Sequence, residues 1–509
     1  MIKAILRLPV PVVLIFIFLP LIASSLKVDR ASNKQPNIII FLADDLGYGD
    51  LGCYGNPIIK TPAIDKFASE GVRLTDCHSA GTVCSPSRAG LLTGRNPYRS
   101  GFYYIQGAWG SHLLSSEVTL AELLKSDGYE TAFLGKWHLS RLEKNLHDEP
   151  GPGDQGFNHW LATTHNAFDG PQNPKKFIKN GKPLGETEGW YCDILVEEAA
   201  HWLTEERDKK KPFFLMISTH EPHTPLSPPD EYRRMYDNQA VDKLEESINY
   251  GGVDRPNKDI SANKDAYYGT VTQLDQAFAR LLAVVEKDQL DENTLIIFTS
   301  DNGPEHPVNF EESRGEWEDP IRDYCFGTPG VLRGMKRYPY EGGHRVPGII
   351  RWPEMIPAGI VSDQLVNATD FVPTIGKLAE VDTPTDRPID GVDAFPAFLG
   401  NKVKREKSPL WIFPTHGDTY RRMPQMAMRH EEYTLIGWFP ENNPDTHLID
   451  WMKSSVPEKF ALYNIRTDPE QEKDISNEQP ELLSQLVPEM VKSWTEIRNE
   501  GPDWRSRKH

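Results

Sequence analysis

The sequence predicts an α/β fold, in which a large, mostly parallel, doubly wound sheet is flanked by helices and followed by a smaller C-terminal α+β domain. Apolar, β-branched runs recur as far as Ser300, helical segments lie between them, and short strands with a terminal helix replace this pattern near residue 400. Continuous apolar runs of this length are typical of strands buried on both faces of a parallel sheet. Such strands need helices as crossovers, which explains the alternation.

Four apolar runs are the expected strands of the large sheet, and each leads into polar residues. The runs are Asn37–Ala43, Glu130–Gly135, Pro212–Ser218 and Leu295–Ser300. The polar clusters are Asp44-Asp45, Lys136-Trp137-His138, His220-Glu221-Pro222-His223 and Asp301-Asn302. Because open α/β sheets bind ligands at the carboxyl ends of their strands, we expect these clusters to form one site.

Amphipathic segments between these runs are the expected helices. They are Thr61–Glu70, Thr119–Ser126, Cys192–Glu206 and Ala262–Lys287. Beyond residue 400, Met426–Gly437 and Ala461–Ile465 have the pattern of short strands, and Glu481–Arg498 that of a helix. We therefore predict a catalytic α/β domain over residues 34–400 and a C-terminal α+β domain, with a short antiparallel sheet, over residues 405–509.

Composition and charge restrict the function. The chain has 509 residues and a net charge of −18, with 38% hydrophobic and 26% charged residues, which is a globular composition. The negative charge argues against nucleic acid as a partner, because phosphate backbones are repelled.

Residues 1–26 have the pattern of a secretory signal peptide. Lys3 and Arg7 precede the apolar run Val10–Ile22, and Ala23-Ser24-Ser25 forms a small-residue exit. The run is short for a bilayer span and contains prolines, although an uncleaved anchor has a similar pattern. We predict export to the periplasm or secretion, with no stable membrane insertion after cleavage.

Export permits disulfides, and the chain has five cysteines: Cys53, Cys77, Cys84, Cys192 and Cys325. With Cys84 set aside, four remain that either pair or stay as buried thiols. Asn367-Ala368-Thr369 is a glycosylation triplet, which is a weak signal by itself.

The most informative segment is Cys84-Ser85-Pro86-Ser87-Arg88, which continues to Arg95 through Leu91-Leu92-Thr93-Gly94. Proline is tolerated in a first helical turn, so the segment predicts a helix that begins near Cys84. Arg88 then shares a helix face with Cys84, and the orphan amides favour an anion there. A buried cysteine beside an ordinary helix cap has the same short pattern.

This segment resembles the signature of the type I, formylglycine-dependent sulfatases of the alkaline-phosphatase superfamily. The resemblance implies that a formylglycine-generating maturation enzyme oxidises Cys84 to formylglycine, whose hydrate is the nucleophile. It extends strongly over residues 36–400 and moderately over the C-terminal segment that begins ALYNIRTDPEQ.

Two acidic pairs are the candidate metal ligands. Asp44, Asp45, Asp301 and Asn302 supply hard oxygen atoms, which suit Ca²⁺ better than zinc or copper, with Mg²⁺ as the second candidate. One such pair alone is usually a turn or a helix cap. The resemblance implies that all four residues, together with the modified Cys84, hold the metal.

The resemblance also implies roles for cationic residues. Arg88 orients formylglycine, Lys136 and His138 in GKWHLS contact the hydrate or the sulfate, and Lys336 bridges the sulfate and the leaving oxygen. His220 contacts the sulfate and protonates the leaving alcohol. The motif EGGHRVP, which follows Lys336, is expected to be mainly architectural.

The segment His159–Asn180 lies where the family places substrate contacts. Thr164, His165 and Asn166 are the candidates there, and His223 is a further one. The segment is similar to bacterial carbohydrate sulfatases, and this resemblance implies exo-acting removal of sulfate from a galactose-type saccharide. Four further residues are candidates for a saccharide platform: Trp109, His112, Trp160 and Trp190.

Two other functions remain open. A phosphonate monoester hydrolase or phosphodiesterase of the same superfamily shares the CxPxR element. A non-catalytic, glycan-binding relative would retain the fold with an unmodified cysteine, although no expected metal ligand, lysine or histidine is missing here.

Overall fold

The computed structural model describes residues 35–143, 149–236, 264–305, 327–413, 424–443 and 445–506. Residues Lys34–His509 form one compact unit. The predicted signal peptide and Cys325 lie outside the described residues. Within these ranges, none of the helices is both long enough and apolar enough to span a bilayer.

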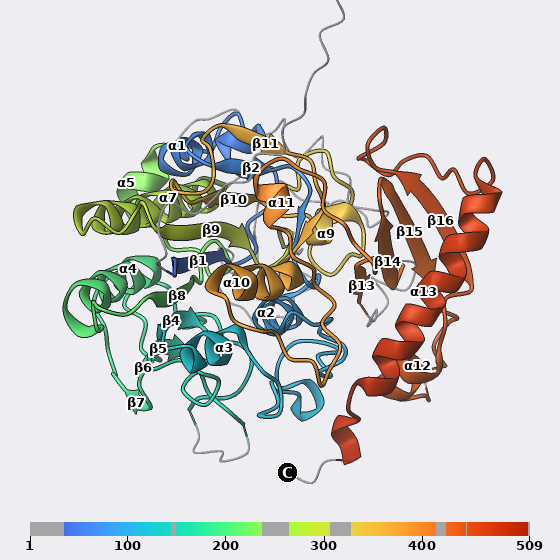
Figure 1. Cartoon of the computed structure of the whole chain (residues 1–509), viewed down its shortest axis with the longest axis horizontal. Coiled ribbons are helices and arrows are strands. Elements are labelled where there is room, and N and C mark those ends of the chain that lie inside the picture. The colour runs from blue at the N-terminus through green and yellow to red at the C-terminus, as the bar shows by residue number, and fades with distance from the viewer. Residues whose placement is uncertain are drawn as a thin grey trace, which may run out of the picture. The chain divides into compact units, whose positions relative to one another are not determined.

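The central sheet has ten strands and confirms the predicted architecture (Figure 1). In order across the sheet they are β11 (Ile360–Ser362), β2 (Val72–Leu74), β10 (Gly348–Arg351), β9 (Thr294–Ser300), β1 (Asn37–Ala43), β8 (Phe213–Ser218), β4 (Glu130–Lys136), β5 (His159–Thr163), β6 (Ile178–Lys179) and β7 (Lys182–Pro183). The five strands from β9 to β5 are parallel, whereas β10 pairs antiparallel with β9. The four predicted strands are thus neighbours, and their carboxyl ends lie at one edge.

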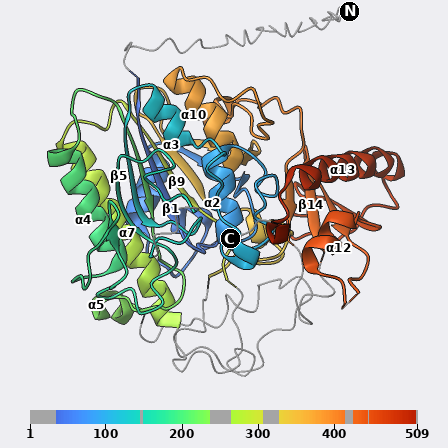
Figure 2. The ribbon, with the colours of Figure 1, turned by 90° about the horizontal axis from the view of Figure 1, so that it is seen from below.

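Helices cover both faces of this sheet, as Figures 1 and 2 show. Ile39 and Phe41 of β1 belong to one buried cluster, and Ile38 and Ile40 belong to the other. One face carries α1 (Pro62–Ser69), α4 (Tyr191–His201) and α7 (Lys264–Lys287), with α5 (Asp230–Arg234) packed on α7. The other carries α2 (Cys84–Thr93), α3 (Leu120–Ser126), α10 (Phe371–Ala379) and α11 (Phe395–Phe398). Both faces of β1 are therefore buried, which explains its uninterrupted apolar sequence.

The segment His159–Asn180, which contains three of the substrate candidates, contributes two strands to the central sheet. Its first residues form β5, which pairs parallel with β4, and β6 returns antiparallel to β5. The substrate candidates Thr164, His165 and Asn166 lie in the connection between these two strands.

A second sheet of four antiparallel strands follows. Its strands are β13 (Leu410–Ile412), β14 (Met426–His430), β15 (Tyr433–Trp438) and β16 (Lys459–Asn464), and its helices are α12 (Leu448–Ser454) and α13 (Pro480–Glu500). The predicted strand Met426–Gly437 is a hairpin of two strands. The turn between His430 and Tyr433 contains Glu431 with a φ of 50°, which lies in the left-handed region.

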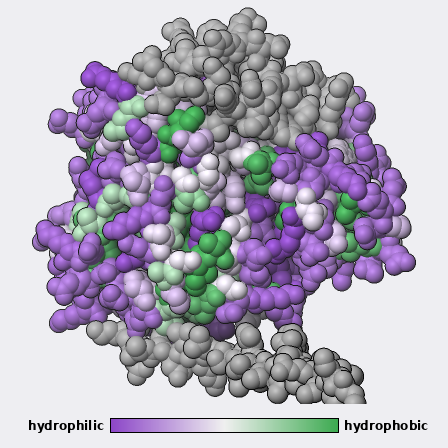
Figure 3. Space-filling model, turned by 90° about the horizontal axis from the view of Figure 1, so that it is seen from above, coloured by the Kyte–Doolittle hydropathy of each residue, from purple (hydrophilic) through white to green (hydrophobic). Residues whose placement is uncertain are grey.

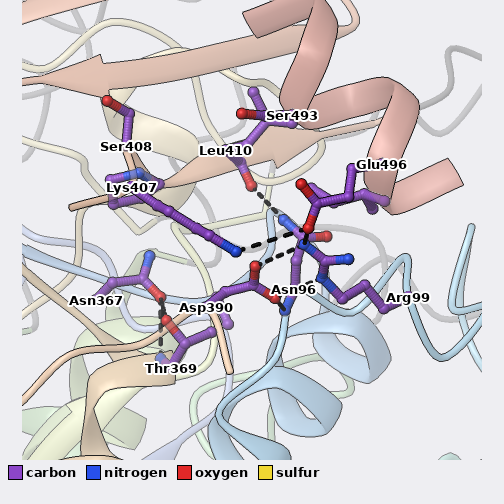
Figure 4. A pocket seen from close by; sticks show the side chains of 13 residues that line it. Asn96, Arg99, Asn367, Thr369, Asp390, Lys407, Ser408, Leu410, Ser493 and Glu496 are labelled. Carbon is purple, nitrogen blue, oxygen red and sulfur yellow. Dashed lines mark hydrogen bonds and ion pairs between the residues drawn. The ribbon is translucent and has the colours of Figure 1, made fainter. Parts of the chain in front are cut away.

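Ion pairs of the buried Arg99 side chain join α13 to the segment after α2, at the small cavity of Figure 4. Arg99 donates to Asp390 over 2.8 Å and to Glu496 of α13 over 2.8 Å. Asn367 lies in the same region, is 3% exposed, and donates its side-chain amide to the Ser79 carbonyl. The Asn367 triplet is therefore not accessible for glycosylation in the folded protein. The face in Figure 3 is mostly hydrophilic, with hydrophobic residues in small separate patches.

Candidate active site

The nucleophile candidate lies at the first residue of α2, as predicted. The residue before it, Val83, has extended backbone angles (φ −147°, ψ 161°), so the helix begins at Cys84. All ten residues of α2 are buried. The Cys84 Sγ atom lies 3.6 Å from Oδ1 of Asp44, which directly follows β1. The helix start and the strand ends therefore meet.

Arg88 ties the helix to the strand ends. Its Nε donates to Oδ2 of Asp301 over 3.0 Å, and its Nη1 donates to the Lys136 carbonyl over 2.7 Å. The Ser218 hydroxyl accepts a further bond from Nη1. The guanidinium is 1% exposed, so these bonds satisfy a charge that burial would otherwise penalise.

The two predicted acidic pairs contact each other. Asp45 has a φ of 65°, and its amide donates to Oδ1 of Asp301 over 3.2 Å. The Asn302 side-chain amide donates to Oδ1 of Asp45 over 2.7 Å. β1 and β9 run in register from Asn37 to Ala43, which places both pairs side by side.

Each lysine donates a hydrogen bond to a different carboxylate of the Asp44-Asp45 pair. Lys136 Nζ donates to Asp44 Oδ2 over 2.6 Å, and Lys336 Nζ donates to Asp45 Oδ2 over 2.8 Å. Lys136 ends β4, where Gly135 has a φ of +111°, and a Cβ at Gly135 would lie 1.9 Å from the Ser218 carbonyl oxygen. Glycine thus allows β4 and β8 to approach and present Lys136.

Sequence reasoning missed Glu305 and Arg337. Glu305 Oε2 lies 3.3 Å from Lys336 Nζ, and Arg337 donates to the same carboxylate over 2.9 Å. Glu305 closely follows Asn302, and Arg337 is adjacent to Lys336. These neighbouring positions were the only signal that the sequence offered.

Burial and neighbouring charges shift the pKa values of the carboxyl groups in opposite directions. Burial would raise the pKa of Asp44, but Lys136 and its other cationic neighbours hold that pKa well below its usual range. Burial raises the pKa of Asp45 to about 7 against the effect of Lys336, and nearby carboxylates add to the increase. Burial also raises the pKa of Asp301. The lysines therefore compensate the carboxylates unequally.

The residues present fit a hard divalent cation. Within the part of the chain that the structure describes, the Asn302 Oδ1 atom is buried without a hydrogen-bond partner, beside the carboxylates of Asp44, Asp45 and Asp301. Unsatisfied buried acceptors are costly, and a cation would satisfy this one while it neutralises the under-compensated carboxylates. Potential ligand atoms of Asp44, Asp45, Cys84 and His223 lie within 4.8 Å of one another.

The structure gives His220 and His223 different environments. His220 is fully buried; its Nδ1 accepts from the Ala167 amide over 3.3 Å, and its Nε2 donates to the Pro225 carbonyl over 3.1 Å. Both ring nitrogens of His220 are therefore used inside the protein. His223 is 12% exposed, and its Nε2 lies 3.5 Å from Oδ2 of Asp45.

Hydrogen bonding defines the proton position on His223. Its Nδ1 lies 2.6 Å from the Thr224 carbonyl, which only accepts, so Nδ1 carries a proton. Burial, followed by Lys336, lowers the pKa of His223 well below its usual value. The free site therefore holds a neutral imidazole whose Nε2 faces the carboxylates.

The remaining predicted residues of the site have different environments. His138 packs edge-on against His165 at a centroid distance of 5.2 Å, and among the described residues its buried Nδ1 has no hydrogen-bond partner. Asn166 is 5% exposed and donates to Asp44 Oδ2 over 2.7 Å, so it orients a metal-ligand candidate. Thr164 is 1% exposed and donates to Glu143, which makes it structural.

The four aromatic candidates do not come together as the predicted saccharide platform. Trp109 and His112 pack against His447 and Trp504 of the C-terminal part. Trp160 packs against the core cluster beneath α3, and the indole of Trp190 donates to the Ser227 carbonyl. Each ring is thus engaged at a different place.

The EGGH segment, α9 (Glu341–His344), is architectural, as expected. A Cβ at Gly343 would lie 1.9 Å from the Tyr338 carbonyl oxygen, and one at Gly342 would lie 2.1 Å from that of Gly334. The four cysteines in the described ranges are free thiols and form no disulfide: Cys53, Cys77, Cys84 and Cys192.

Comparison with known proteins identifies the class that this fold and site define. The chain belongs to the sulfatase family, because the family model described as Sulfatase matches residues 36–381. A model described as N-sulphoglucosamine sulphohydrolase, C-terminal, matches residues 334–500. The protein is therefore a sulfuric ester hydrolase.

Individual relatives support this assignment. Arylsulfatase A of Homo sapiens is 32% identical over 430 residues, which cover 79% of this chain and 74% of the relative. N-acetylgalactosamine-6-sulfatase of Canis lupus familiaris is 30% identical over 429 residues, which cover 80% of this chain and 72% of the relative. The crystal structure of Ps i-CgsB in complex with k-i-k-neocarrahexaose has a TM-score of 0.72 and 27% identity, covering 93% of this chain and 94% of that one.

Proposed function

We propose that this protein is an exported, Ca²⁺-dependent carbohydrate sulfatase that removes sulfate from a galactose-type saccharide by exo action, with formylglycine at position 84. This proposal rests on one observation. At one edge of the sheet, the acidic cluster lies together with Cys84, Arg88 and two lysines. Export rests on the predicted signal peptide, and formylglycine requires a maturation enzyme.

The environment of Cys84 supports its conversion. Burial raises the pKa of the Cys84 thiol to about 12, although Lys136 and Lys336 oppose this effect. A thiol with this pKa is protonated at neutral pH and is a poor nucleophile. An aldehyde hydrate in its place would supply an oxygen nucleophile that does not depend on thiol ionisation.

The metal would be held by Asp44, Asp45, Asp301 and Asn302, and it would supply charge stabilisation for the sulfuryl oxygens. Oxygen donors favour Ca²⁺, whereas the thiol and imidazole also present in the cluster would favour zinc. Conversion of Cys84 removes the sulfur ligand, which shifts the preference towards Ca²⁺.

The cationic side chains act on the sulfate itself. Lys136 and Lys336 flank the acidic cluster, and preorganised cations in a buried site stabilise developing negative charge strongly. We assign protonation of the leaving alcohol to His223 in place of His220, because only His223 presents a ring nitrogen to the cluster. His223 must first gain a proton at Nε2 to act as this acid.

The proposed substrate rests on two relatives. N-acetylgalactosamine-6-sulfatase, by its name, acts on a sulfated galactose derivative, and Ps i-CgsB was solved with a neocarrahexaose. A likeness to a phosphonate monoester hydrolase at 19% identity concerns the fold alone. A sulfated saccharide is therefore the preferred substrate class.

The test uses full-length protein co-produced with a formylglycine-generating enzyme. Turnover of 4-nitrophenyl sulfate, galactose 4-sulfate and galactose 6-sulfate is measured in Ca²⁺ and after chelation. We expect Cys84→Ala to abolish turnover, whereas the free cysteine Cys53 serves as a control in Cys53→Ala. Activity that survives Cys84→Ala, or a preference for phosphonate esters, would contradict the proposal.

A further inference from the structure

Phe168 is an exposed aromatic side chain at the edge of the active site. It is 37% exposed, and it lies in the connection between β5 and β6. A single exposed apolar residue usually needs no explanation. The position of Phe168 is unusual because its ring centroid lies 6.5 Å from that of His223 and 6.5 Å from that of His165.

In the proposed function, His223 marks the side of the site from which the leaving group departs. His223 Nε2 lies 3.5 Å from Asp45, whose carboxylate also accepts from Lys336. A leaving oxygen that receives a proton from His223 must lie next to this nitrogen. Since the Phe168 ring adjoins the His223 ring, the group attached to that oxygen extends over or beside Phe168.

Polar groups border the aromatic ring. Phe168 lines a small cavity together with Glu143, His165, Asn166, Asp169 and Lys176. Lys176 and Asp169 are exposed, and Glu143 accepts a hydrogen bond from Thr164. The cavity has a volume of about 30 Å³, which is room for one water, so a larger ligand would lie on the exposed side of Phe168 with these donors and acceptors beside it.

This combination matches a pyranose better than a flat apolar group. The C–H face of a sugar ring packs on an aromatic face, and its hydroxyl groups need the donors and acceptors around it. A steroid or simple aryl group would use the ring but would gain no hydrogen bonds from these exposed polar groups, which would stay in contact with water.

We propose that Phe168 determines specificity by stacking against the sugar ring that carries the sulfate ester, with Glu143, Asp169 and Lys176 placed to contact its hydroxyl groups. This inference rests on the proposed function, because it assumes that His223 faces the leaving oxygen. Phe168 positions the leaving group and takes no part in bond breaking.

The experiment compares Phe168→Ala, Phe168→Tyr and the control Val361→Ala in the matured full-length enzyme. Val361 is 58% exposed on β11, at the opposite edge of the sheet from β5 and β6. The 4- and 6-sulfates of galactose and N-acetylgalactosamine are tested as substrates and as competitive inhibitors of 4-nitrophenyl sulfate hydrolysis. Inhibition by inorganic sulfate reports the anion site alone.

We expect Phe168→Ala to lower kcat/KM, or to raise the inhibition constant, by about 10-fold for the preferred sugar sulfate. Phe168→Tyr and Val361→Ala should stay within about 3-fold of the wild type, and the constant for inorganic sulfate should not change. Equal losses for sugar sulfate and inorganic sulfate would show a structural role and overturn the proposal.

A second result would also overturn it. If the wild type hydrolyses 4-nitrophenyl sulfate but neither turns over nor binds any of the four sugar sulfates, Phe168 is not a sugar platform although the enzyme is a sulfatase. If the matured wild type hydrolyses no sulfate ester at all, the proposed function itself fails.

Discussion

Two histidines three residues apart after β8 have different environments. His220 uses both ring nitrogens in bonds to Ala167 and Pro225, whereas His223 presents Nε2 to Asp45. Sequence alone shows only that both follow a strand end. Which one faces the site depends on contacts with the β5–β6 connection, which is more than 50 residues away.

Substitution of the two histidines should therefore separate catalysis from stability. His223→Gln should lower turnover of a sugar sulfate by about 10²–10⁴-fold, the usual contribution of a general acid. It should affect 4-nitrophenyl sulfate much less, because nitrophenolate leaves without protonation. Steady-state rates on both substrates check this. A similar loss on both substrates, or a larger loss in His220→Gln than in His223→Gln, would refute the assignment.

His220 should also make stability dependent on pH. Burial lowers the pKa of His220 from 6.5 to about 4, so the unfolded state binds more protons between these values. The stability that the protein has with a neutral, buried His220 is fully present above pH 6.5 and is lost as the pH falls to about 4. It amounts to about 3 kcal/mol if the whole shift is realised.

Urea unfolding at neutral pH and near pH 4 measures this effect. Wild type should lose about 3 kcal/mol more than His220→Gln over this range, because the neighbouring charges Asp44, Lys136 and Asp169 remain in both proteins. Equal losses in the two proteins would mean that another group controls the acid sensitivity.

At the scale of elements, strands that carry chemistry were predictable because local sequence determines them. β1, β4, β8 and β9 are uninterrupted apolar runs with polar residues at their ends. β5 was missed because His159, which hydrogen-bonds to Glu198 over 2.7 Å, gives the strand a polar start. The antiparallel return through β6 is only two residues long and has no periodicity to detect.

β4 depends on glycine at one position, and a matched pair of substitutions tests this. Gly135→Ala places a Cβ 1.9 Å from the Ser218 carbonyl oxygen at a φ of +111°, whereas Gly128→Ala has a φ of +89° with no atom within 4 Å. Gly128→Ala should cost about 1 kcal/mol of unfolding free energy from backbone strain alone. Gly135→Ala should cost more than about 3 kcal/mol and reduce activity, because Lys136 moves. Equal costs in urea unfolding would contradict the close-approach argument.

At the scale of the whole molecule, the C-terminal sheet holds the loop before the nucleophile. Trp411 of β13 donates to the Ser79 carbonyl over 2.7 Å and stacks on His344 at 3.9 Å. Arg429 of β14 donates to Asp76 over 2.7 Å. The sequence predicted this sheet but not its contact with the nucleophile loop, because the partners are more than 300 residues apart.

Loss of this contact should affect both stability and activity. Trp411→Ala should lower the free energy of unfolding by about 3–5 kcal/mol, the usual cost of a buried Trp, and should lower kcat of the folded enzyme. Trp438→Ala, in the same sheet but only half-buried, is the control for a general effect on the sheet. Urea unfolding and kcat are measured for both. If the two variants have the same kcat, the sheet does not position the nucleophile.

The central claim is that the enzyme acts through a modified Cys84 and not through its thiol. Mass spectrometry of the peptide that contains Cys84, taken from enzyme preparations of different specific activity, tests it most directly. We predict the mass of thiol-to-aldehyde conversion, with specific activity proportional to the converted fraction. Full activity in enzyme whose Cys84 is an unmodified thiol would contradict the account.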